Sequence, residues 1–433
     1  MAPSPTLTAA LDAAREAYAK RNPNSLVAFN KATVSLPGGG TRTTLITLPF
    51  PLFIESGSGA TVTDVDGHTY RDFLSDFTSG IYGKSNDILR GAITKALASG
   101  LQFGAHTTHE ARLADHLTSR FPSMDLVRFA NSGTEANLLA ITTALKHTKR
   151  KKVVVFSGGY HGSLLAHFHT GEPGGNDVPG ALRVPFDFII APYNDIEGTK
   201  ALLSPVAKDV GVVIVEPMLG AGGCIPADPA FLQGLRDYTK EIDSVLIFDE
   251  VQTSRLATGG RQSLLGITPD MTTVGKFFGG GFAFGAFGGK AEIMSIFDVR
   301  RPDHVNHGGT FNNSPLTMIA GSTAIEQILT PERLEDLNER GDRLREKLNS
   351  AFGGAGAPFV VTGLGSINQI NCHLPKDDQL PALELVYFGM LERGFWMAQR
   401  GTLALNFEIT DKDVDEFVEA IVESSAAVVK ASA

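Results

Sequence analysis

Cysteine is scarce in this chain, whose 433 residues include only Cys224 and Cys372. Two cysteines cannot build the disulfide framework of a small secreted domain, and they suit a reducing compartment, so we expect a cytoplasmic protein. An excess of positive charge is also lacking, because 47 acidic residues outnumber 38 Lys and Arg and leave a net charge of −9. No polybasic run is longer than residues 149–152, and nucleic acid is therefore not an expected partner.

Long apolar runs are missing as well. No segment reaches the length that spans a bilayer, and residues 1–20 carry Asp12 and Glu16 where a signal peptide would be apolar, so we expect no membrane association. The same residues predict an amphipathic helix that places four side chains on one side: Leu7, Leu11, Ala14 and Tyr18. A hydrophobic content of 42% over this length is sufficient for a large core.

The middle of the chain alternates helical segments with short apolar runs. Strands are predicted at residues 153–156, 188–191, 211–215 and 244–249. This alternation predicts an α/β fold with a mainly parallel, doubly wound sheet. We predict an N-terminal segment (1–67) that contributes to a small domain, a large domain (68–314) and a C-terminal small domain (315–433).

Lys276 has an unusual setting for a lysine. It follows Gly275 and precedes Phe-Phe-Gly-Gly-Gly at residues 277–281, so its surroundings are apolar and glycine-rich. Burial disfavours the charged form of a lysine, and the neutral amine is a nucleophile for carbonyl groups.

Asp249 ends the apolar run 244–249, which is the pattern of a buried parallel strand with a carboxylate at its carboxyl end. Open α/β sheets bind their ligands at that edge. A lysine that forms a Schiff base and an acid that pairs with a pyridinium nitrogen are the two protein groups that pyridoxal 5'-phosphate (PLP) chemistry requires. We therefore predict a PLP site built on Lys276 and Asp249.

A helix start is the predicted phosphate site. Residues 131–137 read Asn-Ser-Gly-Thr-Glu-Ala-Asn and lead into an apolar helical stretch. Ser132 with Glu135 three residues later also satisfies a plain capping box, which needs no ligand. As a phosphate site, the same start offers N–H groups, two hydroxyls and the positive end of the helix dipole.

Three other features have simpler explanations. Tyr160 follows Gly159 in a turn after the strand 153–156, where an aromatic ring either stacks on a flat cofactor or packs in the core. The segments 106–109 and 304–307 each hold two histidines at a metal-compatible spacing, but no cysteine or carboxylate pattern supports them, so we predict no metal site. Glu250 should not share a site with Asp249, because successive strand residues face opposite ways.

Taken together, these segments resemble a known family. The chain resembles the class III, fold-type I PLP-dependent aminotransferases, in the branch with glutamate-1-semialdehyde aminomutase and the β-amino acid (β-phenylalanine type) aminotransferases. The matching blocks lie in the family's order between Pro37 and Gly401: residues 131–136, 159–162, 215–218 (Val-Glu-Pro-Met), 249–251, 275–276 and 309–312 (Gly-Thr-Phe-Asn). The resemblance implies a seven-stranded-type sheet in the large domain and a smaller α+β domain formed from both chain ends.

The resemblance also implies a role for each matching residue. Lys276 would bond covalently to PLP and move the proton, and Asp249 would pair with the pyridine nitrogen. The phosphate would be held by Ser132, Gly133 and Thr134, together with Thr310 of a second subunit in a homodimer. The remaining cofactor residues would be Tyr160 and Val251 on the two ring faces, Gln252 near the phenolic oxygen, and His161 and Glu216 close by.

Two arginines bear on the substrate. Arg42 follows the glycine run 38–40, and Arg400 lies in the segment Ala-Gln-Arg-Gly at 398–401. Each is a plain surface charge by default, but the planar guanidinium also binds a carboxylate with two hydrogen bonds. In β-amino acid aminotransferases, arginines at matching places hold carboxylates, so the resemblance implies substrate-binding roles for both.

The predicted function is transfer of an amino group from a β-amino acid, with an aromatic group as one option, to a 2-oxo acid such as 2-oxoglutarate or pyruvate, by ping-pong chemistry. An intramolecular aminomutase of the glutamate-1-semialdehyde type and a non-catalytic PLP-binding protein are the alternatives. An aminomutase needs no second substrate, so dependence on an added 2-oxo acid separates it from an aminotransferase.

The setting of Lys276 generates a direct prediction. Purified protein should absorb in the near-visible range as a Schiff base, and borohydride reduction should fix PLP onto the peptide that contains Lys276, as peptide mass analysis can determine. Label on another lysine, or no label, would contradict the assignment.

Overall fold

The computed structural model describes residues 4–165 and 184–432. The chain forms two compact units, one of residues Asp87–Asp336 and one built from both ends of the chain, Met1–Asn86 and Leu337–Ala433. The helix α11 (Pro331–Ala355) runs through the second division without a break. The two units divide at residues 86/87 and 336/337. The domain boundaries expected from the sequence are 67/68 and 314/315, and they remain a prediction.

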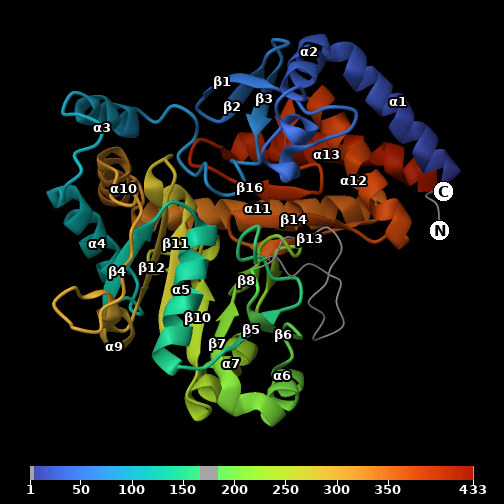
Figure 1. The fold of residues 1–433 in the computed structure, drawn as a ribbon. Helices are drawn as coiled ribbons and strands as arrows, with labels where there is room; N and C mark the ends of the chain where they lie inside the picture. Colours follow the sequence, from blue (N-terminus) through green and yellow to red (C-terminus); the bar gives the residue numbers. More distant parts are fainter. Residues whose placement is uncertain (1–3, 166–183, 433) are drawn as a thin grey trace. The chain divides into compact units, whose positions relative to one another are not determined.

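The unit of residues 87–336 is organised by a seven-stranded sheet (Figure 1). Its spatial order is β4 (Leu126–Ala130), β12 (Gly285–Gly289), β11 (Met271–Gly275), β10 (Val245–Asp249), β7 (Val210–Val215), β5 (Lys152–Phe156) and β6 (Asp187–Ala191). Only β12 runs antiparallel to its neighbours, β4 and β11, and the other pairs are parallel. The predicted mainly parallel sheet is confirmed.

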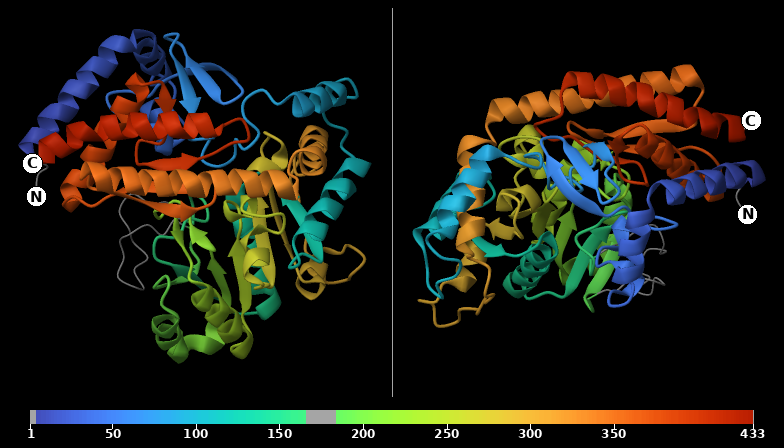
Figure 2. Two further views of the ribbon diagram at one scale, coloured as in Figure 1. Left: turned by 180° about the vertical axis from the view of Figure 1, so that it is seen from behind. Right: turned by 90° about the horizontal axis from the view of Figure 1, so that it is seen from above.

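Helices cover this sheet on both faces (Figures 1 and 2). The helices of the unit are α3 (Asp87–Leu97), which packs against α10, α4 (Thr108–Arg120), α5 (Gly133–Thr148), α6 (Ile196–Leu203), α7 (Pro229–Glu241), α8 (Gly260–Leu265), α9 (Ala291–Met294) and α10 (Pro315–Gln327). A two-stranded hairpin, β8 (Met218–Leu219) and β9 (Ile225–Pro226), follows β7.

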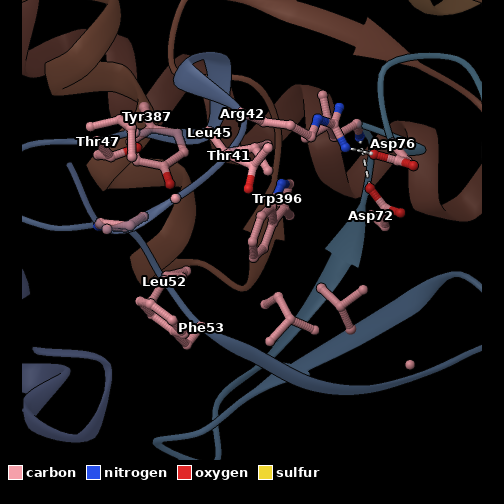
Figure 3. A pocket seen from close by; sticks show the side chains of 18 of the residues that line it. Thr41, Arg42, Leu45, Thr47, Leu52, Phe53, Asp72, Asp76, Tyr387 and Trp396 are labelled. Carbon is pink, nitrogen blue, oxygen red and sulfur yellow. Dashed lines mark hydrogen bonds and ion pairs between the residues drawn. The ribbon is translucent and has the colours of Figure 1, made fainter. Parts of the chain in front are cut away.

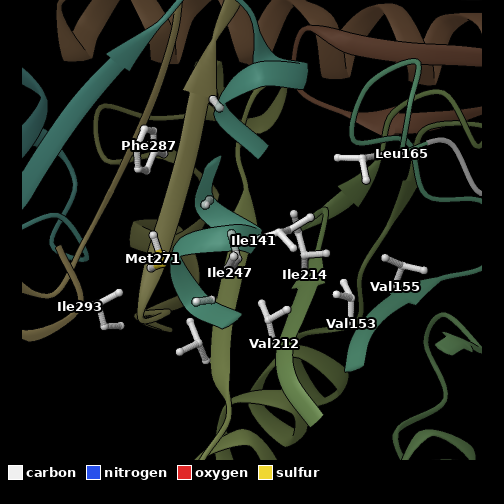
Figure 4. Close-up of a cluster of buried hydrophobic side chains, with 14 of the residues drawn as sticks. Ile141, Val153, Val155, Leu165, Val212, Ile214, Ile247, Met271, Phe287 and Ile293 are labelled. Atoms are coloured by element: carbon white, nitrogen blue, oxygen red, sulfur yellow. The ribbon is translucent and has the colours of Figure 1, made fainter. Parts of the chain in front are cut away.

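The core of this unit follows the two-residue period of its strands. Val245 and Ile247 of β10 belong to the hydrophobic cluster on the α5 side, which Figure 4 shows. Leu246 and Phe248 belong to the cluster on the other side, with residues of α7. Because both faces of the strand are buried, its side chains are all apolar until Asp249, which lies at the carboxyl edge of the sheet.

The unit formed by the two chain ends has two smaller sheets. One has the order β1 (Ile54–Ser58), β2 (Thr61–Asp64), β3 (Thr69–Asp72) and β15 (Phe395–Trp396), and the other the order β13 (Phe359–Leu364), β14 (Ile367–Cys372) and β16 (Thr402–Ala404). Since β15 pairs in parallel with β3, segments more than 300 residues apart share one sheet.

The helices of this unit are α1 (Pro5–Arg21), α2 (Pro23–Ala32), α12 (Lys376–Glu392) and α13 (Asp411–Ser432). Of these, α1, α12 and α13 lie side by side (Figure 2). The predicted amphipathic N-terminal helix is confirmed, because α1 buries Leu7, Leu11 and Tyr18. The Tyr18 ring packs at 5.1 Å from the ring of Phe388 in α12.

Two observations bear on the surroundings of the protein. Within residues 4–165 and 184–432, no helix combines the length and the apolar run that a membrane crossing requires. Cys224 and Cys372 are free and buried, and burial raises the pKa of the Cys224 thiol to about 12.

The sheet core generates a stability prediction. Ile247 is fully buried between β7 and β11, so Ile247→Ala should lower the free energy of unfolding by about 2–5 kcal/mol through lost contacts and a cavity. Leu264→Ala in α8, where the side chain is 59% exposed, is the control and should change it by less than about 0.5 kcal/mol. Thermal unfolding of both variants measures the difference, and equal losses would contradict this account of the core.

Candidate active site

The residues predicted to bind the cofactor gather at the carboxyl edge of the seven-stranded sheet. Tyr160 and His161 follow β5, Glu216 follows β7, and Lys276 follows β11. Asp249, Val251 and Gln252 lie at and just after the end of β10, and α5 begins directly after Ser132. Parallel strands end at a common edge, which explains how residues from four loops meet there.

The carboxylate of Asp249 is 4% exposed and is surrounded by donors. Its Oδ2 lies 2.8 Å from His161 Nδ1 and accepts a hydrogen bond of 2.7 Å from Asn137 Nδ2. Its Oδ1 accepts the backbone N–H of Val251 at 3.0 Å. Glu250, the next residue, has a different set of partners, Thr253, Arg261 and Gln262, as the alternation along the strand predicts.

His161 and Glu216 form the charged surroundings of Asp249. Burial alone would lower the pKa of His161, but its hydrogen bond to Asp249 and the nearby negative charges outweigh burial and raise the pKa. Burial raises the pKa of Glu216 to about 7, although the charge of His161 opposes this shift. The carboxylate of Glu216 accepts the backbone N–H groups of Tyr160 (2.8 Å) and Gly220 (3.0 Å), and it thereby ties the turn after β5 to the hairpin after β7.

The start of α5 has the predicted capping geometry. Ser132 is the N-cap, and its Oγ accepts the N–H of Glu135 at 3.1 Å. The reciprocal bond of the capping box is displaced by one residue, because Glu135 Oε2 accepts the N–H of Asn131 at 2.8 Å. In the part of the chain that the structure describes, the N–H groups of Gly133 and Thr134 have no protein acceptor, as a phosphate-binding start requires.

Lys276 lies directly after β11 in a short 3₁₀ turn, and it is half-buried. Its φ of 54° is in the left-handed region, which costs a non-glycine residue about 1–3 kcal/mol and is concentrated at functional sites. A Cβ on Gly275 would lie 3.5 Å from the nitrogen of Gly133, so the lysine turn packs against the start of α5.

Close approaches of glycine shape the rest of the crevice. A Cβ on Gly133 would lie 3.0 Å from a methyl group of Val251, and one on Gly220 would overlap the side-chain amide of Gln252. A Cβ on Gly162 would overlap Thr134. These glycines let the loops after β5 and β10 come close to the start of α5, and the loop after β7 come close to the loop after β10.

Thr310 is exposed on the loop that precedes α10. The neighbouring Asn312 accepts a hydrogen bond of 2.8 Å from Asn131, and His307 accepts one of 2.9 Å from Arg128 Nε. The loop is therefore anchored beside the start of α5, with Thr310 exposed on it. A cavity of about 570 Å³ borders this loop.

Arg42 and Arg400 both belong to the unit formed by the chain ends. Arg42 Nη1 donates to Asp76 at 2.8 Å, and its guanidinium carbon lies 5.5 Å from the centre of the Phe77 ring. Figure 3 shows this pair at the polar end of a cavity of about 710 Å³ whose walls are largely apolar, with Leu52 and Trp396 among the lining residues. Arg400 is exposed and lines a second cavity with Thr43 and Thr44, the residues that follow Arg42.

Sequence reasoning missed two residues of the site, Asn137 and Thr273. Asn137 lies on the buried face of α5, among Ala136, Ala140 and Ile141. A polar side chain on an otherwise apolar face was the available signal, because a buried amide must find hydrogen-bond partners. No signal of this kind marks Thr273, which lies within an ordinary β-strand. No group of three metal-binding side chains was found among residues 4–165 and 184–432.

Comparison with known proteins identifies the family. Residues 46–424 match the family model of class-III aminotransferases. The chain is 42% identical over 422 residues to β-phenylalanine transaminase of Variovorax paradoxus, with 95% of each chain covered. A crystal structure of the β-phenylalanine aminotransferase from that organism superposes with a TM-score of 0.92, covering 96% of this chain and 97% of the other at 40% identity.

Two further relatives give the breadth of the similarity. Glutamate-1-semialdehyde 2,1-aminomutase of Bacillus subtilis is 36% identical over 416 residues, which cover 92% of this chain and 96% of that protein. A solved transaminase with PLP bound has a TM-score of 0.88 at 30% identity, with coverage of 95% of this chain and 99% of the other.

These findings define a PLP-dependent enzyme of fold type I. The chain belongs to the class III aminotransferases, and it is a PLP-dependent transaminase. The residues present suit this cofactor, because the site offers a buried carboxylate, an amine on a 3₁₀ turn, and the N–H groups of Gly133 and Thr134 at a helix start.

Glu216 generates a pH prediction for the cofactor-free protein. Its folded-state pKa of about 7 lies above the ordinary value of 4.5, so its contribution to stability is complete below pH 4.5 and is lost as the pH rises through about 7. Glu216→Gln does not titrate. The stability of the wild type relative to this variant should therefore fall, on the order of 2 kcal/mol, from about pH 5 to about pH 8.

Thermal unfolding at both pH values measures this difference. Glu335→Gln, on the exposed side of α11, is the matched control and should follow the wild type at both pH values. A stability difference between wild type and Glu216→Gln that does not change with pH would contradict the shifted pKa.

Proposed function

We propose that this transaminase moves an amino group from a β-amino acid to a 2-oxo acid, with 2-oxoglutarate or pyruvate as acceptor, in two half-reactions that alternate at one site. The observation that carries the chemistry is the convergence of Asp249, Lys276 and the start of α5 at one sheet edge. The similarity to a β-phenylalanine transaminase supports the class of donor. The buried free cysteines are compatible with a reducing compartment such as the cytoplasm.

In this proposal, Asp249 and Lys276 have complementary roles. PLP, when bound, withdraws electrons from the carbon that carries the amine. The anionic carboxylate of Asp249 keeps the ring nitrogen protonated, and the donors around the carboxylate support its charge. Lys276 Nζ would accept the proton of the amine-bearing carbon and, as an ammonium, would return it to the carbon on the other side of the amine nitrogen.

The remaining proposed roles concern binding. Ser132, Gly133 and Thr134 bind the phosphate through N–H and hydroxyl groups. Tyr160 and Val251 pack on the ring faces, and Gln252 lies near the phenolic oxygen. Glu216 and His161 hold the loops and the charge around Asp249, as their hydrogen bonds support.

Arg42 is proposed to bind the carboxylate of the donor. Arg42 Nη1 donates to Asp76. The opposite edge of the guanidinium, formed by Nε and Nη2, would donate two hydrogen bonds to the carboxylate of the donor. A β-amino acid carries its carboxylate one carbon further from the amine than an α-amino acid does, and a receptor on a separate segment suits that geometry. The apolar walls of the cavity beside Arg42 support an aromatic or alkyl substituent on the donor.

The similarity to glutamate-1-semialdehyde aminomutases supports a second candidate, an intramolecular amino transfer. Turnover of a range of amino donors with and without 2-oxoglutarate or pyruvate tests the two candidates. Aminotransfer requires the added 2-oxo acid, whereas an aminomutase converts its substrate without one.

Arg42 generates a prediction about specificity. Arg42→Ala should lower kcat/KM for carboxylate-bearing donors, by an amount that corresponds to about 2 kcal/mol in activation free energy. This loss is near the low end for a buried carboxylate pair because the Arg42 side chain is 47% exposed. The kcat/KM for simple amines should change much less. Arg400→Ala should act mainly on the half-reaction with 2-oxoglutarate, whose second carboxylate needs a partner. Arg393→Ala, which removes another ion pair of the same unit, is the control. Equal losses for acids and amines in Arg42→Ala would make Arg42 structural.

Thr310 is proposed to serve the phosphate site of a second copy of the chain, in a homodimer. Its exposure on a loop that is anchored beside α5 supports this proposal. Two-fold symmetric pairs are the commonest assemblies of soluble chains. The alternative is that Thr310 bonds only within its own chain.

Mixed dimers test the shared site. When Lys276→Ala chains are mixed with Thr310→Ala chains, each mixed dimer should have one site with both defects and one with neither, so activity at limiting PLP should return. Mixing Lys276→Ala with Asp249→Asn is the control and should restore nothing, because both residues would belong to the same chain's site. No recovery in verified Lys276→Ala/Thr310→Ala dimers, or an active monomer, would contradict the shared site.

A further inference from the structure

Asn137 links three elements at the candidate active site. It lies one helical turn into α5 and is 1% exposed. Its Nδ2 donates to Asp249 Oδ2 at the end of β10 (2.7 Å) and to the backbone oxygen of His161 after β5 (3.0 Å). Its Oδ1 accepts a hydrogen bond of 2.6 Å from Thr273 Oγ1 in β11. The amide therefore uses both of its donor hydrogens and its acceptor.

The acceptors around Asn137 determine which way its amide faces. The oxygen and nitrogen of a buried amide have similar shapes, so only the hydrogen-bond partners decide their placement. The carboxylate of Asp249 and the carbonyl of His161 can only accept, so Nδ2 must face them, and Oδ1 is left to accept from the hydroxyl of Thr273. Thr273 is also the strand partner of Asp249 in the β10–β11 pair, so the sheet register itself brings it to this position.

The two oxygens of Asp249 have unequal surroundings. Among the described residues, Oδ2 interacts with two side chains, His161 and Asn137, and Oδ1 with the backbone N–H of Val251. Each carboxylate oxygen has about two acceptor positions. These residues thus occupy both positions of Oδ2 and one of the two on Oδ1.

We propose that Asn137, held in place by the hydrogen bond from Thr273, is a positioning residue for Asp249, and that it leaves Asp249 Oδ1 as the oxygen that accepts the ring N–H of PLP. This inference rests on the proposed role of Asp249 as the partner of the ring nitrogen. Because Asn137 lies one turn after Gly133, the same helix places both the phosphate-binding start and the acid that faces the ring. Two separate contacts to the cofactor then depend on the position of α5.

The experiment uses holoenzyme loaded with PLP that carries nitrogen-15 in its ring, because the NMR shift of that nitrogen reports its protonation directly. In the wild type, the nitrogen should stay protonated across the pH range in which the protein is folded. In Asn137→Ala, we expect it to lose its proton at a lower pH. We also expect the PLP dissociation constant to rise and kcat of the donor half-reaction to fall, each roughly ten- to hundredfold, with KM for the donor nearly unchanged.

Matched variants separate positioning from folding. Thr143→Ala removes a buried hydroxyl of the same helix, which among the described residues bonds to the Leu139 carbonyl alone, and it should leave the nitrogen signal and the PLP affinity unchanged. Thr273→Val keeps the side-chain shape but removes the donor, so it should shift the signal in the direction of Asn137→Ala. Thr273→Ser keeps the hydroxyl and should restore the wild-type signal. If Asn137→Ala does not fold, the comparison of Thr273→Val with Thr273→Ser still decides the test.

Asp249→Asn is the reference for loss of the acid itself. If it abolishes protonation of the ring nitrogen while Asn137→Ala and Thr273→Val both retain the wild-type signal and PLP affinity, Asn137 has no positioning role and the inference is overturned. If Asp249→Asn retains a protonated nitrogen, the proposed role of Asp249 fails first, and the inference fails with it.

Discussion

Asp249 is only 4% exposed, and its carboxylate lies at the end of a strand that is buried on both faces. A buried charge is tolerated only where donors surround it, and here His161, Asn137 and the N–H of Val251 fulfil that need. These groups come from the loop after β5, from α5 and from the chain after β10. The hydrogen bonds to the Asp249 carboxylate therefore join these three segments, and the same segments carry residues proposed to bind PLP.

The sheet explains why these segments come together at this edge. Parallel strands place the residues that follow β5, β7, β10 and β11 side by side, and both hydrophobic clusters hold the strands in register. Glycines then allow backbone approaches that any side chain would prevent, as at Gly133 against Val251. The proposed carboxylate receptors, Arg42 and Arg400, belong to the unit built from the chain ends.

Local signals in the sequence were sufficient for the parts of the site that depend on neighbouring residues. The apolar run before Asp249 predicted the buried strand β10, and the capping residues at Ser132 predicted the start of α5. The Asn137–Thr273 bond was not predictable, because it joins residues 136 positions apart through the packing of α5 on β11. The contact of Arg42 with Asp76 and Phe77 depends on a turn, Ser75–Thr78, in which four non-glycine residues have positive φ, and no sequence signal marks such a turn.

The most direct test of the central claim is the rate of the amino-donor half-reaction in PLP-loaded Asp249→Asn, measured in a single turnover beside the wild type. The substitution removes the charge and keeps the shape. If the carboxylate maintains the protonated ring, the half-reaction should slow by roughly a hundred- to a thousandfold while PLP stays bound. A half-reaction near the wild-type rate with PLP fully bound would contradict the account and would place the acid elsewhere, with Glu216 as the first residue to examine.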